Sequence, residues 1–171
     1  NNILNYKGNQ IGKSIKEENC DSIVDDIFKN LKNYSCQIIY PEDVMVGKNL
    51  DDKSKVKELD EIKKDDFILD IGPKTVSKIK DIIKKSETIL WNGPAGYFEN
   101  PNFAYGTNEI AKAIIKRNRD KLIYSVAGGG DTIAFLNKIN AINDFNFVST
   151  AGGAFLEYLE GKKLPGIKAL N

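Results

Sequence analysis

The stretch that most constrains this chain's fold is residues 125–134, which read Ser-Val-Ala-Gly-Gly-Gly-Asp-Thr-Ile-Ala. The apolar run at 122–127 predicts a strand, and the glycines that follow predict a tight turn opening a helix. Glycines without a Cβ let an anion approach the backbone, and free amides and the helix dipole at a helix start attract phosphate. Asp131 and Thr132 can cap the helix or reach a metal ion that the phosphates carry. On these residues alone, a phosphate site and an ordinary strand-to-helix turn are equally supported.

Charge and length exclude several classes of protein. The chain has 171 residues, enough for one core, and 25 Lys and Arg against 24 Asp and Glu leave a net charge of +1. No overall field therefore favours nucleic acid or an acidic membrane. No apolar run approaches the roughly 20 residues of a membrane helix, and the polar residues 1–16 do not resemble a signal peptide. The chain starts with Asn1, which indicates an internal residue of a longer protein or a processed end.

Histidine is absent from the sequence, which removes Ser-His-Asp and Cys-His catalysis and imidazole metal sites. Any chemistry must therefore use carboxylates, lysines, backbone amides or a metal brought by the ligand. The two cysteines, Cys20 and Cys36, have neither a disulfide framework nor a zinc-site spacing. We expect reduced thiols and a cytoplasmic protein.

Strand and helix patterns alternate along most of the chain. Apolar runs predict strands at 37–40, 67–71, 88–91, 122–127 and 145–149, and shorter ones at 44–46 and 56–59 on either side of a charged loop. Apolar residues at helical spacing predict a helix of about three turns from residue 21, and further helices at 73–85, from about 107, at 133–139 and at 155–161. This alternation is typical of βα units on a parallel sheet, so we expect an α/β fold.

Three Gly-rich loops, at 92–99, 128–132 and 150–153, each follow a predicted strand directly. Ligands of open α/β sheets bind outside the carboxyl ends of the strands, so the three loops should meet at one edge. Two of them lead straight into helices, whose N-termini can face one anion. The contiguous glycines do not fit the Gly-x-Gly-x-x-Gly pattern of dinucleotide-binding proteins, and no Gly-Lys-Ser/Thr follows them as in a P-loop.

Several long motifs, in order, resemble the phosphoglycerate kinase family over essentially the whole chain. They lie at 11–14 (Ile-Gly-Lys-Ser), 70–75 (Asp-Ile-Gly-Pro-Lys-Thr), 91–99, 127–132, 149–154 and 156–166. The resemblance implies a Rossmann-like three-layer fold, a parallel sheet with helices on both faces. It implies that residues 1–171 form a single domain, most of the nucleotide-binding C-terminal domain. The N-terminal substrate domain, and a lysine-bearing segment that contacts the nucleotide phosphates, would then lie outside this chain.

The resemblance also assigns roles to individual residues. It places Glu99 on the ribose of ATP or ADP, and Asp131 beside the Mg²⁺ that the nucleotide carries; one carboxylate is chemically sufficient for such an ion. Without the family, Glu99 would be read as a surface acid near a turn. The other implied nucleotide contacts are Asn92, Pro94, Gly128, Gly129, Gly130, Thr132 and Thr150. The implied catalytic positions, which stabilise the transferring phosphoryl group, are Gly129, Gly130, Gly152 and Gly153.

The sequence departs from the family pattern at three places. Ala151 stands where glycine is common, Phe155 where a small polar residue is common, and Tyr97 where a smaller apolar residue is common. An added methyl at Ala151 is tolerated unless the backbone needs a positive φ. Ala151 and Phe155 therefore affect the expected geometry of the glycine turn at 150–153. Tyr97 affects the expected shape of the site near the nucleotide sugar.

The leading interpretation is a fragment of a glycolytic, monomeric phosphoglycerate kinase that binds Mg·nucleotide and is inactive alone. Its expected partners are the nucleotide and the N-terminal domain of the same enzyme, not nucleic acid or membrane. The alternative is a non-catalytic nucleotide-binding or interaction module of the same fold. An oxidoreductase domain of the Rossmann type is weaker, because its glycine spacing is absent.

Overall fold

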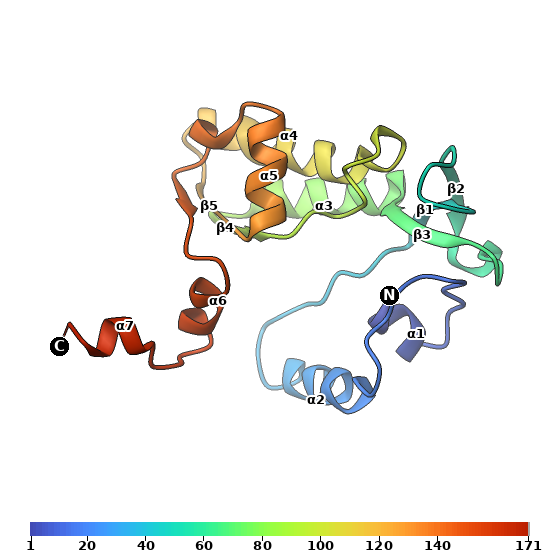
Figure 1. Ribbon diagram of the computed structural model, residues 1–171, viewed down its shortest axis with the longest axis horizontal. Coiled ribbons are helices and arrows are strands. Elements are labelled where there is room, and N and C mark those ends of the chain that lie inside the picture. Colours follow the sequence, from blue (N-terminus) through green and yellow to red (C-terminus); the bar gives the residue numbers. More distant parts are fainter. Residues whose placement is uncertain (171) are drawn as a thin grey trace. The chain divides into compact units, whose positions relative to one another are not determined.

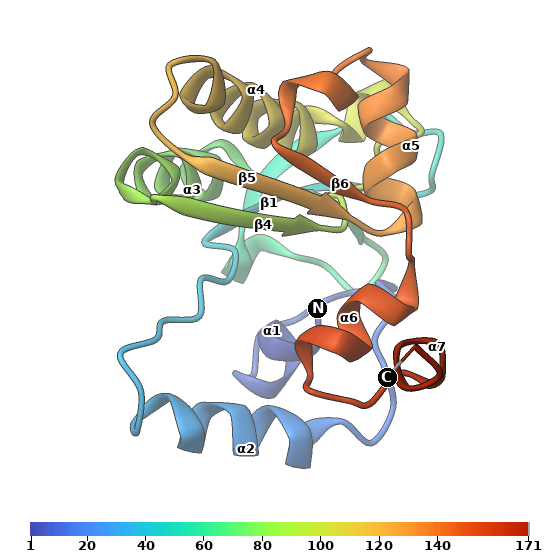
Figure 2. The same ribbon diagram turned by 90° about the vertical axis from the view of Figure 1, so that its left-hand side faces the viewer.

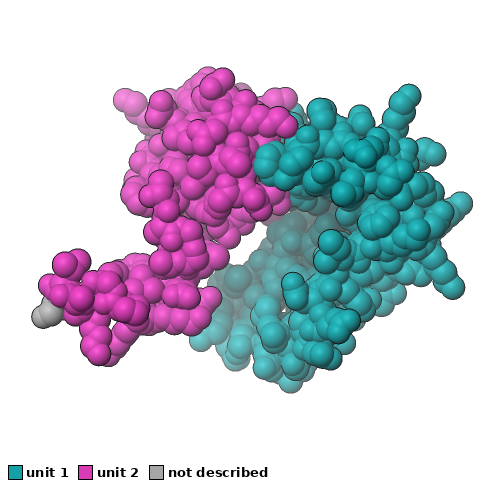
Figure 3. Space-filling model, in the orientation of Figure 1, with its two compact units in different colours: residues 1–81, 95–110 teal, residues 82–94, 111–171 magenta. Residues whose placement is uncertain are grey.

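The computed structural model describes residues 1–170, which form two compact units (Figures 1 and 3). Unit 1 comprises residues 1–81 and 95–110, and unit 2 comprises residues 82–94 and 111–171. Two helices, α3 (Pro73–Lys85) and α4 (Tyr105–Arg119), continue from one unit into the other. The expectation of a single domain over residues 1–171 stays a prediction. No helix in the described part of the chain is long and apolar enough to cross a membrane.

Unit 1 is built around a three-stranded antiparallel sheet in the order β2-β1-β3. Its strands are β1 (Asp43–Gly47), β2 (Lys55–Glu58) and β3 (Phe67–Ile71), and its first helices are α1 (Asn2–Tyr6) and α2 (Asp21–Leu31). Val44 and Val46 of β1 are fully or almost fully buried and pack with Ile62. Leu59, which follows β2, and Ile68 of β3 also pack against this cluster, so it lies on one face of the antiparallel sheet.

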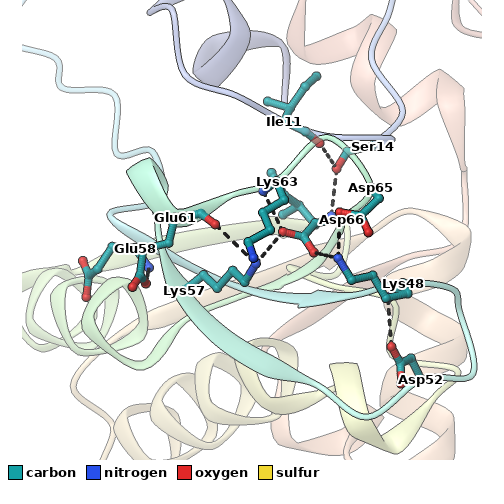
Figure 4. A network of polar contacts seen from close by, with 11 residues as sticks. Ile11, Ser14, Lys48, Asp52, Lys57, Glu58, Glu61, Lys63, Asp65 and Asp66 are labelled. Atoms are coloured by element: carbon teal, nitrogen blue, oxygen red, sulfur yellow. Dashed lines mark hydrogen bonds and ion pairs between the residues drawn. The ribbon is translucent and has the colours of Figure 1, made fainter.

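A buried carboxylate ties the loops of unit 1 together (Figure 4). Asp66, 1% exposed, accepts hydrogen bonds from the Nζ atoms of Lys48 at 2.7 Å and Lys57 at 2.6 Å, and from the Lys63 amide at 2.7 Å. Its backbone oxygen accepts from the Lys13 amide at 2.7 Å. The network therefore fastens the segment around residues 11–14 to the start of β3.

Unit 2 contains a parallel sheet in the order β4-β5-β6. Its strands are β4 (Thr88–Asn92), β5 (Tyr124–Gly128) and β6 (Phe147–Ser149), and its remaining helices are α5 (Gly130–Lys138), α6 (Gly153–Leu159) and α7 (Pro165–Lys168). The order of strand, helix and strand along the chain gives the parallel crossovers. The predicted α/β fold with a Rossmann-like parallel sheet is confirmed.

The two faces of this parallel sheet differ. Figure 2 shows α4 and α5 on one side, where Trp91 contacts Phe135 of α5 edge-to-face at 5.9 Å between ring centroids. Side chains alternate along a strand, so the neighbours of Trp91 point the other way. There Leu90, Tyr124 and Phe147 are about half exposed, and Leu90 and Phe147 lie on either side of Val126 in the register.

Several expectations for the first half of the chain need correction. Residues 37–40 form no strand, because no segment in the described part of the chain pairs with them. The strand β3 belongs to an antiparallel sheet with β1, not to the parallel sheet that its βα pattern suggested. The predicted helix from residue 21 is confirmed as α2, yet of its apolar stripe Val24 is buried while Ile23 and Ile27 are exposed.

Candidate functional site

The last residues of the three parallel strands lie in register at the carboxyl edge of unit 2. Asn92 of β4 is paired with Gly128 of β5, and Gly128 with Ser149 of β6. Asn92 and Gly128 are also the first residues of two Gly-rich loops, and Ser149 directly precedes the third. The predicted convergence of the loops at one sheet edge is therefore confirmed for the parts of these loops that belong to unit 2.

The turn after β5 has the geometry that its glycines predict. Gly129 is the N-cap residue of α5 and has φ 88°, a conformation that side chains with a Cβ rarely adopt. A Cβ there would also lie 2.5 Å from Oδ1 of Asn92. Gly130, by contrast, begins α5, and a Cβ there would meet no atom within 4 Å. The backbone at the start of α5 is thus open to an approaching group, and its first amides have no partner within the helix.

Thr132 links this turn to the loop after β4. Its side chain is fully buried, and its Oγ accepts a hydrogen bond from the Gly93 amide at 2.7 Å. The preceding Asp131 is exposed, in the first turn of α5. Thr132 therefore holds the turn from the buried side, whereas Asp131 presents its carboxylate to solvent.

The residues at this turn fit a magnesium ion that is bound together with phosphate groups. Residues 1–170 contain no group of three or more Asp, Glu or Cys side chains placed to hold a metal by themselves. Magnesium is commonly held by one or two carboxylates, with waters and phosphate oxygens as its other ligands. The single exposed carboxylate of Asp131 at a helix N-terminus matches that donor set.

The turn after β6 is open to solvent. Gly152, the N-cap residue of α6, has φ 55°, and a Cβ on Gly152 or Gly153 would meet no atom within 4 Å. Thr150 and Ala151 are exposed. Ala151 is not among the residues with positive φ, so its methyl group is accommodated without backbone strain. Phe155 lies against the turn after β5, because a Cβ on Gly128 would be 2.9 Å from the Phe155 ring.

Trp91 lies beneath the end of β4. Its indole Nε1 donates to the Gly93 oxygen at 2.7 Å, and its ring also contacts Phe145 at 6.0 Å between centroids. At 7% exposure, the indole is sensitive to movements of the loop that begins at Asn92. It is therefore a natural fluorescent reporter for this edge of the sheet.

The remainder of the loop after β4, residues 95–99, belongs to unit 1. The Tyr97 amide donates to the Leu69 oxygen of β3 at 2.7 Å, and Phe98 is buried. Glu99 follows Phe98 and is exposed, as a residue that meets a ligand must be. The structure thus anchors the loop just before the carboxylate that the sequence singles out.

Two buried residues that support this loop were missed by sequence reasoning. Thr107, fully buried, accepts hydrogen bonds on its Oγ from the amides of Ala95 at 3.1 Å and Gly96 at 3.3 Å. Asp70, in β3, lies directly against Gly96. An acid inside the apolar run of residues 67–71 was the signal available for Asp70. No signal in the sequence marks Thr107.

The predicted site residues are thus distributed over both units. Glu99 belongs to unit 1. The others belong to unit 2, namely Asn92, Pro94, Gly128, Gly129, Gly130, Asp131, Thr132, Thr150, Gly152 and Gly153. Pro94 is half-buried, and Asn92 is exposed beside Gly129. Both cysteines are free thiols, as expected.

Comparison with known proteins gives consistent results. The family described as phosphoglycerate kinase matches residues 1–162. Phosphoglycerate kinases of Chelativorans sp. (strain BNC1) and Francisella philomiragia are 42% and 43% identical over 99% of this chain. The solved phosphoglycerate kinase structure from Coxiella burnetii matches 99% of the chain with 39% identity and a TM-score of 0.91. The one from Pyrococcus horikoshii OT3 matches 98% with 31% identity and a TM-score of 0.75.

The chain spans less than half the length of these proteins. It covers 43% of each of the two curated relatives, and 44% and 42% of the two solved chains. Within that span, the match runs through both units and includes all the Gly-rich loops. The chain therefore belongs to the phosphoglycerate kinase family.

Proposed function

We propose that this chain carries much of the Mg·nucleotide site of a phosphoglycerate kinase. The parent enzyme reversibly transfers a phosphoryl group from 1,3-bisphosphoglycerate to ADP, which yields 3-phosphoglycerate and ATP in glycolysis. The observation that carries the proposal is the register of Asn92, Gly128 and Ser149, from which three Gly-rich loops leave one sheet edge in a chain of this family.

In this proposal the phosphates of ADP or ATP lie at the start of α5. The conformation of Gly129 and the open space at Gly130 support this, because backbone amides can approach an anion there. Thr132 holds the turn through its contact with Gly93, and Gly152 and Gly153 offer a second exposed turn near the transferring group. Asn92, Pro94 and Thr150 line the nucleotide, and Glu99 accepts hydrogen bonds from the ribose hydroxyls.

Phosphoryl transfer asks for positioning and for positive charge on the equatorial oxygens, not for a covalent catalyst. Backbone amides at the glycine turns supply fixed partial charges, so the absence of histidine is no obstacle. The Mg²⁺ ion that arrives with the nucleotide would be held by Asp131 and would neutralise phosphate charge. The acceptor substrate requires residues outside this chain, so we expect the chain alone to bind nucleotide without turnover.

Calorimetric titration tests the proposal directly. Mg·ADP and Mg·ATP should bind the chain saturably, whereas NADH should not, since its recognition needs a different glycine spacing. If circular dichroism shows that the chain is folded and Mg·ADP still gives no heat of binding, the proposal is contradicted.

The alternative, a non-catalytic nucleotide-binding module, would also bind Mg·ADP and Mg·ATP. It would differ from the kinase in having no catalytic activity. Mixing the chain with the separately produced N-terminal part of a relative, such as the Coxiella burnetii enzyme, distinguishes the two. Formation of ATP from ADP and 1,3-bisphosphoglycerate in the mixture supports the kinase. Nucleotide binding without turnover in a mixture that forms a stable complex supports the module.

A further inference from the structure

One buried carboxylate in unit 1 has no part in the function proposed so far. Asp70 lies in β3, one residue before its end at Ile71, and is 2% exposed. It accepts hydrogen bonds from the Ile71 amide at 2.8 Å and the Gly106 amide at 2.7 Å, and also from the Tyr105 amide. Two of these amides belong to the first turn of α4, so the carboxylate joins β3 to the N-terminus of that helix.

The same carboxylate is in contact with the loop that leads to Glu99. A Cβ on Gly96 would lie 2.4 Å from Oδ1 of Asp70, and a Cβ on Gly106 would lie at the same distance. Neither glycine has a positive φ, so the absence of a side chain at these positions serves close approach, not backbone conformation. The loop and the start of α4 are therefore both packed against the same carboxylate oxygen.

The other anchors of the loop lie on the two elements that Asp70 joins. The Tyr97 amide donates to the Leu69 oxygen on β3, and the amides of Ala95 and Gly96 donate to Thr107 on α4. If β3 and the start of α4 separate, these anchors cannot all be kept. The position of residues 95–99 therefore depends on the link that Asp70 makes.

We propose that Asp70 is a positioning residue for nucleotide binding: by joining β3 to α4 against Gly96, it holds the loop of residues 95–99 so that Glu99 meets the ribose. This inference rests on the proposed function, in which Glu99 binds the nucleotide sugar. Asp70 itself does not touch the ligand and acts through the loop.

The titration of Asp70 gives this role a measurable pH dependence. Burial raises the pKa of Asp70 to about 6, against the opposing effect of the hydrogen bonds from Gly106, Ile71 and Tyr105. Its surroundings are backbone amides, glycine backbone and the Ile71 side chain, and no ion pair involves it within residues 1–170. Because its folded pKa lies above the unfolded value of 3.8, its contribution to stability is greatest below pH 4 and is lost as the pH rises through 6. At neutral pH the folded chain therefore carries an ionised carboxylate that is less stable there than its protonated form would be.

The test compares three variants of the full chain. Asp70→Asn removes the charge, and Gly96→Ala inserts a methyl group between loop and carboxylate while the carboxylate stays. Asp43→Asn is the matched control: Asp43 is also buried, and it caps α3 through the amides of Lys74 at 2.9 Å and Thr75 at 2.8 Å, without contact to the loop. We expect the dissociation constant of Mg·ADP to rise about tenfold in the first two variants and to stay within about twofold in the control.

The pH profile adds a readout that a structural cap would not change. Between pH 7 and pH 5, protonation of Asp70 should weaken Mg·ADP binding to the wild type relative to Asp70→Asn, while the folding stability of the wild type rises relative to that variant. Protonation of the nucleotide itself is common to both proteins and cancels in the ratio. Parallel profiles, or equal Mg·ADP affinities at pH 7, would overturn the inference.

Amide hydrogen exchange without nucleotide separates the inference from the proposed function. The Tyr97 amide should exchange at least tenfold faster in Asp70→Asn and Gly96→Ala than in the wild type or Asp43→Asn. If the wild type does not bind Mg·ADP, the proposed function fails for this chain, and exchange alone decides whether Asp70 holds the loop. Unchanged Tyr97 exchange in Gly96→Ala contradicts the inference even if Asp70→Asn does not fold.

Discussion

Replacing Asp66 by asparagine should destabilise unit 1 through charge and not through shape. The carboxylate accepts hydrogen bonds from two ammonium groups and from the Lys63 amide, and asparagine keeps the volume while it removes the charge (Figure 4). Burial alone would raise the pKa of Asp66, but the hydrogen bonds from Lys48, Lys57 and the Lys63 amide outweigh burial and hold the pKa well below its usual range.

The size of the effect follows from the exposure of the partners. Removing one member of a fully buried ion pair costs about 3–5 kcal/mol, whereas exposed pairs contribute about 0–1 kcal/mol. The side chain of Lys57 is 16% exposed and approaches the buried case, while that of Lys48 is 47% exposed and keeps contact with water. We therefore expect Asp66→Asn to lower the free energy of unfolding by about 2–3 kcal/mol at pH 7.

Urea unfolding followed by circular dichroism at pH 7 and at pH 3 measures this cost. The folded pKa lies below the unfolded value of 3.8, so the contribution of Asp66 is present above that value and is lost as the pH falls below it. The difference between wild type and variant should therefore shrink at pH 3. Asp65→Asn is the control, because Asp65 pairs with Lys48 at 2.8 Å but is 59% exposed and should cost under about 1 kcal/mol. A cost that is equal at both pH values, or equal to that of the control, would refute the reasoning.

Two further predictions concern unit 2. Gly129→Ala should lower the free energy of unfolding by about 1–3 kcal/mol in thermal melts, because of its positive φ and the contact with Asn92, whereas Gly130→Ala should be neutral or slightly stabilising. A melt in which both variants lose equal stability would argue against the turn described above. Threonine at Leu90 or at Phe147 should each lower the free energy of unfolding in urea by about 1 kcal/mol, since both side chains are half exposed and only half of their apolar area leaves water. A cost above about 3 kcal/mol for either variant, as for a fully buried side chain, would argue against a half-exposed sheet face.

The parallel half of the fold could be predicted because its signals are local. The runs that became β4 and β5 are apolar, end in glycine or asparagine and lead into loops, and register at the carboxyl edge follows from the parallel arrangement. The glycine turn at 128–130 was predicted for the same reason, since positive φ and free helix amides are properties of a few consecutive residues.

The first half of the chain was predicted less well because strand pairing is not a local property. Residues 37–40 are as apolar as many strands, but a strand also needs a neighbour to accept its hydrogen bonds. The βα pattern around β3 does not reveal that β1 and β3 run antiparallel. The acid inside the apolar run of β3 marks Asp70 as unusual, but it does not reveal its partner, the Gly106 amide 36 residues away. Thr107 binds the Ala95 amide 12 residues away, and nothing in the sequence around Thr107 indicates that contact.

The most direct test of the central claim is a Trp91 fluorescence titration with Mg·ADP and with Mg·pyrophosphate, on the wild type, Asp131→Ala and Glu99→Ala. Trp91 donates to Gly93 and contacts Phe135 of α5, so it should respond when phosphate binds at the start of that helix. The account predicts that Asp131→Ala no longer binds Mg·ADP or Mg·pyrophosphate. Glu99→Ala should weaken only Mg·ADP, because pyrophosphate has no ribose. No saturable response in a folded wild type, or equal weakening of both ligands by Glu99→Ala, would contradict it.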